Sequence, residues 1–112
     1  MISFVRQNQR IPVNGTELDG WLYVPQQNPP TRAPAIVMSH GFDAIKELYI
    51  DTFAEAFCEA GYVVALYDHC NFGKSGGDVR GEIIPKQQVA DMRDVITWLS
   101  LRPEVDGSRI GV

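Results

Sequence analysis

Residues 35–42 constrain the fold of this chain more than any other stretch. They form an apolar, β-prone run that ends abruptly at the pair His40-Gly41, which predicts a buried strand leading into a tight loop. An amphipathic segment follows, and a second apolar run comes after it. A strand that is apolar on both faces, followed by a helix and another apolar strand, indicates a parallel sheet covered by helices. The expected fold class is therefore α/β.

The His-Gly pair is the first candidate for a functional position. Gly41 allows a sharp backbone turn, which leaves the amide of Phe42 free to point into the space above the carboxyl end of the strand. An amide in that place can donate a hydrogen bond to an oxyanion. The alternative is that His40-Gly41 only ends the strand, and these residues alone leave both interpretations open.

Size and charge exclude several classes of function. A chain of 112 residues is one domain at most and is short for a complete α/β enzyme. Its net charge of −4 provides no basic face for nucleic acid or anionic lipid. We find neither an apolar run of ~20 residues nor an apolar signal sequence. A cytoplasmic protein without a nucleic-acid or membrane partner is expected.

The two cysteines give no sign of a metal site. Cys58 falls on the predicted inward face of a helix and Cys70 falls in a loop, and neither has metal-like spacing or a pair of histidines beside it. Reduced thiols are therefore expected. We also expect no bound metal and no cofactor.

The rest of the chain alternates strands and helices. Asn14-Gly15 is the pair best suited to a two-residue hairpin turn, and Asp106-Gly107 is expected to turn the chain into the last strand. Apolar residues at helical spacing predict two helices, with inward faces formed by Ile50, Phe53, Ala54, Phe57 and Cys58 in the first and by Val89, Met92, Val95, Ile96 and Leu99 in the second. The expected elements are an antiparallel hairpin over 4–24, strands over 35–39, 62–67 and 108–112, and helices over 46–60 and 85–101.

Residues 73–77 match two catalytic motifs in form only. They read Gly-x-Ser-x-Gly, but a nucleophile elbow needs a strand directly before it and a helix directly after it. Neither is predicted here, so Ser75 is expected to be a loop residue. A phosphate-binding loop would need a glycine where this chain has Asp68, and a carboxylate there would repel phosphate.

His40 and His69 are the only histidines, and each follows the end of a predicted strand. A catalytic base needs a carboxylate to orient it and a nucleophile within reach, and neither partner is evident in the sequence. Both histidines are expected to order the loops by hydrogen bonding across the two strand ends. The nearby carboxylates are expected to act as caps or turn formers; they are Asp43, Asp68 and Asp78.

Taken together, these segments resemble the amino-terminal half of an α/β-hydrolase. The similarity is greatest to dienelactone-hydrolase-like and X-prolyl-peptidase-like esterases, a group that includes polyketide acyltransferases and thiohydrolases. It extends from Val13 to the end of the chain and depends on the order and spacing of several motifs. The segments that carry it are residues 39–42, 61–68, 71–77 and 109–112.

The resemblance implies a site at the carboxyl ends of the strands. The Phe42 amide would supply half of the oxyanion hole, and His40, Gly41, Asp68 and His69 would form the supporting loops. Cys70 stands where the family has an arginine that braces the His-Gly turn, and a thiol cannot replace the donors of a guanidinium.

The resemblance also implies that the fold is incomplete. The nucleophile, the acid and the catalytic histidine of the family would follow Val112. With the family's strand order 1-2-4-3-5, the last strand would be an open, apolar edge.

Two functional hypotheses follow, and a third is disfavoured. The first is a serine acyl hydrolase or acyltransferase that acts on a small ester or thioester when completed and is inactive as these 112 residues alone. The alternative is a non-catalytic module whose open edge pairs with the remaining half of a hydrolase or with a second subunit. A small nucleotide-binding domain would have to bind ATP or GTP, which we do not expect.

Overall fold

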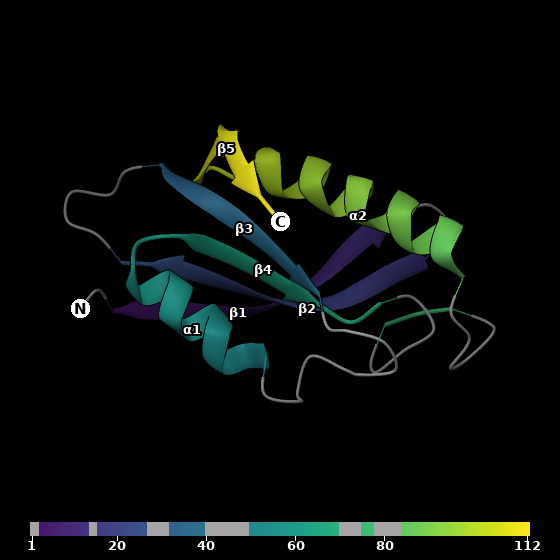
Figure 1. Cartoon of the computed structure of the whole chain (residues 1–112), viewed down its shortest axis with the longest axis horizontal. Coiled ribbons are helices and arrows are strands. Elements are labelled where there is room, and N and C mark those ends of the chain that lie inside the picture. The colour runs from purple at the N-terminus through teal and green to yellow at the C-terminus, as the bar shows by residue number, and fades with distance from the viewer. Residues whose placement is uncertain (1–2, 14–15, 27–31, 40–49, 70–74, 78–83) are drawn as a thin grey trace.

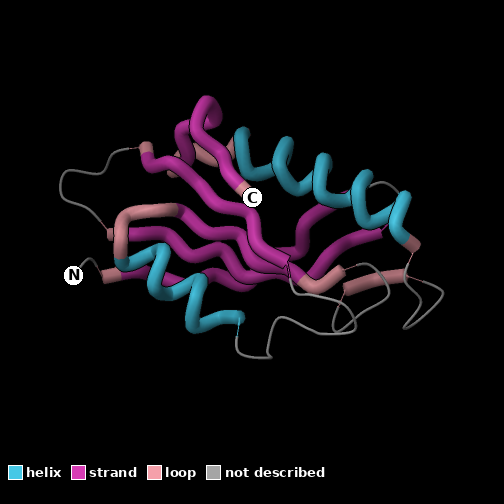
Figure 2. The backbone as a smooth tube through the Cα atoms, in the orientation of Figure 1, coloured by secondary structure: helices cyan, strands magenta, loops and turns pink. Residues whose placement is uncertain are grey.

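The computed structural model describes residues 3–13, 16–26, 32–39, 50–69, 75–77 and 84–112. They form a single sheet with one helix against each of its faces (Figures 1 and 2). The strands lie in the order β1-β2-β4-β3-β5, which is the order that the resemblance implied. The elements are β1 (Phe4–Val13), β2 (Thr16–Pro25), β3 (Ala33–Ser39), α1 (Ile50–Glu59), β4 (Val63–Tyr67), α2 (Pro85–Ser100) and β5 (Val105–Gly111).

An antiparallel hairpin forms one side of the sheet. β1 and β2 pair along their whole length, from Phe4 opposite Pro25 to Val13 opposite Thr16. The expected turn residues, Asn14-Gly15, lie outside the described residues. β2 also pairs antiparallel with β4, so it joins the hairpin to the parallel part of the sheet.

The parallel part of the sheet is built on β3 and β4. Their register runs from Ala35 opposite Val63 to Ser39 opposite Tyr67, so both strands end at the same edge. All five residues of β4 are buried. Because side chains alternate across a strand, β4 contributes to the core on both faces, as the sequence predicts.

Two hydrophobic clusters show which helix covers which face. Val63, Ala65 and Tyr67 of β4 belong to the cluster that contains Val95 and Leu99 of α2. Val64 and Leu66, which alternate with them, belong to the cluster that contains Ala54 and Cys58 of α1. The two helices therefore cover opposite faces of the sheet, which matches their positions in Figure 1. Within the described residues, neither is long and apolar enough to cross a bilayer.

The inward face of α1 is narrower than its apolar spacing predicts. Ala54 and Cys58 are fully buried, but the side chains of Phe53 and Phe57 are 62% and 39% exposed. The side chain of Ile50 lies outside the described part of the structure. The small side chains of Ala54 and Cys58 let the helix pack closely on the sheet. The apolar periodicity predicts that a helix forms, but it does not determine how the helix is rotated about its axis, so it wrongly placed Phe53 and Phe57 inward.

The expected face of α2 also needs correction. Val95 and Leu99 are buried, and Met92 and Ile96 pack against them from partly buried positions. Val89 is 57% exposed, because the buried line of α2 passes instead through Asp91. An acidic side chain thus occupies an inward position that a purely apolar pattern cannot identify.

The last strand begins at Val105, before the predicted start at Ser108. Asp106-Gly107 therefore lies within β5 and not in a turn ahead of it. The register is irregular, because Val105 pairs with Ala33 whereas Ile110 pairs with Ala35.

Asp106 retains turn-like bonding inside this irregular strand. Its Oδ1 accepts hydrogen bonds from the Ser108 amide at 3.1 Å and from Ser108 Oγ at 2.6 Å. Its Oδ2 accepts a bond from Arg109 Nε at 2.8 Å. The Ser108 and Arg109 donors lower the pKa of Asp106 to about 2. The sequence therefore identified the turn-forming residue but not the strand around it.

Candidate functional site

The candidate site lies where β3 and β4 end side by side. Ser39 and Tyr67 face each other as the last pair of the parallel register. Asp68 and His69 follow Tyr67 directly. His40, Gly41 and Phe42, predicted to form the turn and half of an oxyanion hole, lie outside the described residues. Their contribution stays a prediction.

Asp68 is fixed to the hairpin through its backbone. Its amide donates to the Asp19 carbonyl at 3.0 Å, and its own carbonyl accepts a bond from Ser75 Oγ at 2.6 Å. The residue is fully buried. The chain leaving β4 is thereby held against β2. The role of Asp68 in supporting an oxyanion hole stays a prediction.

Ser75 completes this link from the other side. Its hydroxyl accepts a hydrogen bond from the Asp19 amide at 2.8 Å while it donates to Asp68, and the residue is only 3% exposed. A hydroxyl that is buried and bonded both as donor and as acceptor is poorly placed to attack a substrate. This is the loop role that the sequence predicts for Ser75.

Gly76 explains why a glycine follows this serine. Its amide donates to the Glu17 carbonyl at 2.8 Å, and a Cβ at this position would collide with Thr16 Oγ1. The glycine at the variable position after Ser75 therefore permits close contact between the loop and β2. The Gly-x-Ser-x-Gly pattern here joins a loop to a hairpin.

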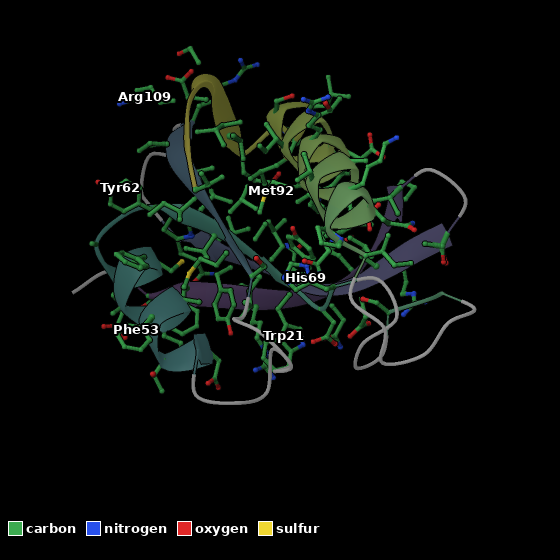
Figure 3. The ribbon with its side chains drawn as sticks, turned by 45° about the vertical axis from the view of Figure 1, so that its right-hand side comes forward. Trp21, Phe53, Tyr62, His69, Met92 and Arg109 are labelled. Carbon is green, nitrogen blue, oxygen red and sulfur yellow. The ribbon has the colours of Figure 1, made fainter. Side chains whose placement is uncertain are left out.

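His69 packs on Tyr67 and lines a pocket beside α2. The two rings meet edge to face with centroids 5.7 Å apart. The pocket has a volume of about 390 Å³ and is mainly apolar; Figure 3 shows His69 and Met92, two of its lining residues. The others are Pro85, Gln88, Val89 and Arg93. His69 is thus positioned by an aromatic contact as well as by its loop.

Tyr67 is a component of this region that the sequence did not single out. Its hydroxyl donates to Met92 Sδ at 3.7 Å and also forms a hydrogen bond with Ser39. Burial raises the pKa of Tyr67 to about 12, so the phenol stays neutral at physiological pH. Tyr67 therefore links the ends of β3 and β4 to α2. The cross-strand hydrogen bonding expected of His40 and His69 stays a prediction.

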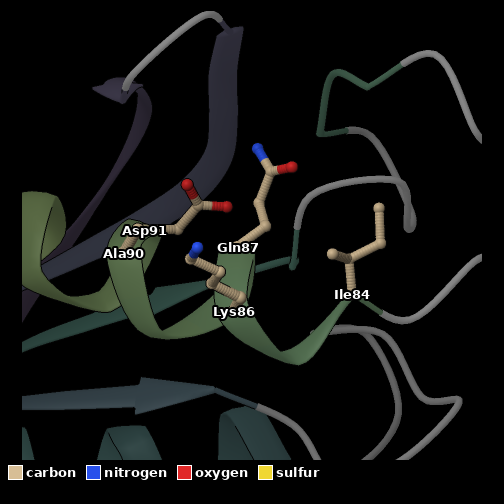
Figure 4. A pocket seen from close by; sticks show the side chains of 5 residues that line it. All are labelled: Ile84, Lys86, Gln87, Ala90 and Asp91. Atoms are coloured by element: carbon tan, nitrogen blue, oxygen red, sulfur yellow. The ribbon is translucent and has the colours of Figure 1, made fainter.

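Asp91 is the second residue that sequence reasoning missed. It is 2% exposed, and its Oδ2 has no hydrogen-bond partner in the described part of the chain. Burial, with a smaller contribution from the charge of Asp94, raises the pKa of Asp91 to about 6. Figure 4 shows its carboxylate beside Gln87. The only sequence signal was its spacing of four residues before Val95 and eight before Leu99, which places all three on one face of the helix.

Neither cysteine nor metal chemistry is indicated by the described residues. Cys58 is a buried free thiol, and burial raises its pKa to about 12, which makes it unreactive near neutral pH. Within the same residues, no group of three or more His, Cys, Asp and Glu side chains is placed to hold a metal ion. Cys70 lies outside them.

Comparison with known proteins places this fold among hydrolases. A family model described as X-Pro dipeptidyl-peptidase (S15 family) matches residues 14–112. A thiohydrolase of Aspergillus aculeatus is 40% identical over 102 residues, covering 91% of this chain and 31% of the relative. A polyketide transferase of Aspergillus fumigatus is 37% identical over 107 residues, covering 94% of this chain and 35% of the relative.

Solved structures agree with the sequence comparison. The crystal structure of the α/β hydrolase GrgF from Penicillium superposes with a TM-score of 0.85 at 32% identity. The match covers 96% of this chain and 37% of that protein. The chain thus spans about a third of the length of the relatives that it matches.

The first prediction concerns the Ser75 link. Ser75→Ala leaves the buried Asp68 carbonyl and Asp19 amide without their hydroxyl partner, so we expect a loss of ~1–3 kcal/mol in the free energy of unfolding. Ser100→Ala is the matched control, because it also removes a hydroxyl bonded to a backbone carbonyl, but an exposed one. Urea unfolding measures both, and equal losses would contradict the structural role of Ser75.

The second prediction concerns the pH dependence of stability. The pKa of Asp91 is higher in the folded protein than in an unfolded chain, so the folded protein binds the proton of this carboxyl group more tightly. The stabilisation is complete below the unfolded pKa of about 4 and is lost as pH rises through about 6. The free energy of unfolding of Asp91→Asn minus that of the parent protein should therefore increase by ~1–3 kcal/mol from pH 4 to pH 7.5. Unfolding at both pH values tests this; a difference that does not change with pH would refute it.

Proposed function

Because this chain belongs to the X-Pro dipeptidyl-peptidase (S15) family, we propose that it forms the amino-terminal part of a serine acyl hydrolase or acyltransferase. The substrate would be a small ester or thioester. The observation that carries the proposal is the parallel pairing of β3 and β4, which ends both strands at one edge with Asp68 and Ser75 tied to β2. The relatives named thiohydrolase and polyketide transferase support the acyl chemistry.

The proposed reaction passes through an acyl-enzyme. A serine supplied by chain beyond Val112 attacks the acyl carbon as a histidine takes its proton, and the carbonyl oxygen becomes an oxyanion. The Phe42 amide donates to that oxyanion. The C–O or C–S bond then breaks, the alcohol or thiol leaves with the proton, and water or a second acceptor takes the acyl group.

The described residues would support this reaction by holding the loop. Asp68 and Ser75 fix the exit of β4 to the hairpin, next to the end of β3. His69 would border the substrate space through its apolar pocket. These residues position the loop, while the covalent steps belong to groups outside them.

We further propose a cytoplasmic location with no nucleic-acid or membrane partner. The net charge of −4 supports this, because phosphate-rich partners require a cluster of basic side chains.

The proposed activity can be tested on the polypeptide encoded by the complete gene. It should hydrolyse p-nitrophenyl butyrate or a short acyl thioester, whereas residues 1–112 alone should not. Phe42→Pro removes the backbone N–H, and Phe42→Ala retains it. We expect kcat of the proline variant to fall ~10²-fold below that of the alanine variant, the cost of one oxyanion donor.

Two results would overturn the proposal. One is the absence of any ester or thioester turnover by the complete polypeptide. The other is equal kcat for the two folded Phe42 variants, which would exclude the amide from the oxyanion hole.

A second candidate function follows from the position of β5. In the described sheet β5 is an outer strand that pairs with β3 alone, and Val112 is exposed. Such an edge can pair with another subunit, which would make residues 1–112 a non-catalytic module.

Sedimentation velocity tests this second candidate. A module of this kind should form a defined oligomer, such as a dimer of twice 12.5 kDa. A monodisperse 12.5 kDa monomer at micromolar concentration would rule out self-pairing.

A further inference from the structure

The carboxylate of Asp91 has no evident purpose in acyl transfer. It lies on the inward line of α2 with Val95 and Leu99 and is 2% exposed. Its Oδ2 lacks a hydrogen-bond partner among the residues that the structure describes. Burying a carboxylate oxygen that accepts no hydrogen bond is unfavourable, because the solvation by water is lost without replacement. A group that supplied N–H donors and positive charge would recover much of that cost.

Asp91 is one of the residues that line a pocket at the start of α2. The pocket has a volume of about 460 Å³, and Asp91 contributes to its wall with Gln87 and Lys86 (Figure 4). Ile84 and Ala90 supply apolar surface. In the view of Figure 4 the Asp91 carboxylate and the Gln87 amide project to the same side of the helix. The pocket therefore presents one buried anion and one adjacent amide to an incoming group.

The charges around the pocket select for a cation. The charge of Asp94 disfavours the ionised form of Asp91, and ionised Asp91 in turn raises the pKa of Tyr67. Among the described residues, burial and the charge of Asp94 therefore both act against the ionised form of Asp91. Lys86 is an exposed residue of the pocket wall, and its flexible side chain can move away from an incoming cation.

A metal ion fits this pocket poorly. Within the described residues no set of three potential protein ligands surrounds it, and Ca²⁺ or Mg²⁺ requires several oxygen ligands. A flat guanidinium needs only acceptor oxygens in its plane, and it tolerates apolar walls better than a strongly hydrated ammonium does. The pocket supplies a carboxylate, the Gln87 carbonyl oxygen and the apolar walls of Ile84 and Ala90.

We propose that the pocket at the start of α2 binds a guanidinium group, which donates hydrogen bonds to Asp91 and stacks between Ile84 and Ala90. The group can come from a small molecule or from an arginine side chain of a polypeptide, since both present the same donors. The site is separate from the proposed acyl chemistry, so its test does not depend on enzyme activity.

Methylguanidinium chloride is the direct probe. Titrated into the ¹⁵N-labelled protein at pH 7.5 and constant ionic strength, it should cause saturable shifts in the amide signals of residues 86–91. Tetramethylammonium carries the same charge without N–H donors, so it should cause no saturable shift. A linear response, or equal responses to the two cations, would overturn the proposal.

Three variants assign the binding to Asp91. Asp91→Asn should weaken methylguanidinium binding at least ten-fold, because a charge-assisted bond to a buried carboxylate is lost. Asp94→Asn, which removes a charge of the same kind from the same helix, should change the affinity by less than about two-fold. Lys86→Met should strengthen binding about two-fold by removing a like charge. Equal affinities in the parent and Asp91→Asn proteins would refute the site.

A competition experiment distinguishes a small-molecule guanidinium from the arginine side chain of a polypeptide. An arginine-containing peptide, Gly-Arg-Gly, should displace methylguanidinium if the pocket admits a side chain attached to a backbone. If it does not compete while methylguanidinium binds, the site takes small molecules only. The matched peptide Gly-Lys-Gly should compete more weakly, because an ammonium cannot place two donors in one plane.

Discussion

The parallel pairing of β3 and β4 is the constraint on which the rest of the structure depends. It brings two strands to one edge of the sheet and buries β4 on both faces. Because β4 is central, the hairpin must join it from one side while β3 and β5 extend the sheet on the other. The helix between β3 and β4 then covers one face, and the helix that follows β4 covers the opposite face. The exits of both strands, where function is expected, follow from this arrangement.

The loop after β4 shows how tertiary structure determines the meaning of a short motif. Its Gly-x-Ser-x-Gly pattern matches a nucleophile elbow in letters, but Ser75 is buried and bonded to the backbones of Asp19 and Asp68. Gly76 allows the close approach to Thr16 that this bonding needs. The same residue types can therefore expose a hydroxyl for chemistry or bury it as a structural link. The elements before and after the motif distinguish the two cases.

The sequence predicted strands better than it predicted helix faces, for physical reasons. Apolar runs of β-branched residues fix a buried strand by themselves, as in β3 and β4. Strand order cannot be derived from such runs and came only from the resemblance. Periodicity locates a helix but not its rotation, so Phe53 and Val89 were placed inward although both are exposed. Asp91 and Tyr67 escaped notice because their importance comes from burial and neighbours that are distant in sequence.

The most direct test of the proposed chemistry is intact-protein mass spectrometry of the polypeptide encoded by the complete gene, quenched within milliseconds after mixing with a short acyl thioester. A covalent acyl-enzyme predicts a mass increase equal to the acyl group minus the one hydrogen that it replaces. This adduct should disappear as turnover ends, and it should still form when Ser75 is replaced by alanine. Turnover without any adduct would contradict the assignment. So would an adduct that forms on the parent protein but not on the Ser75→Ala variant.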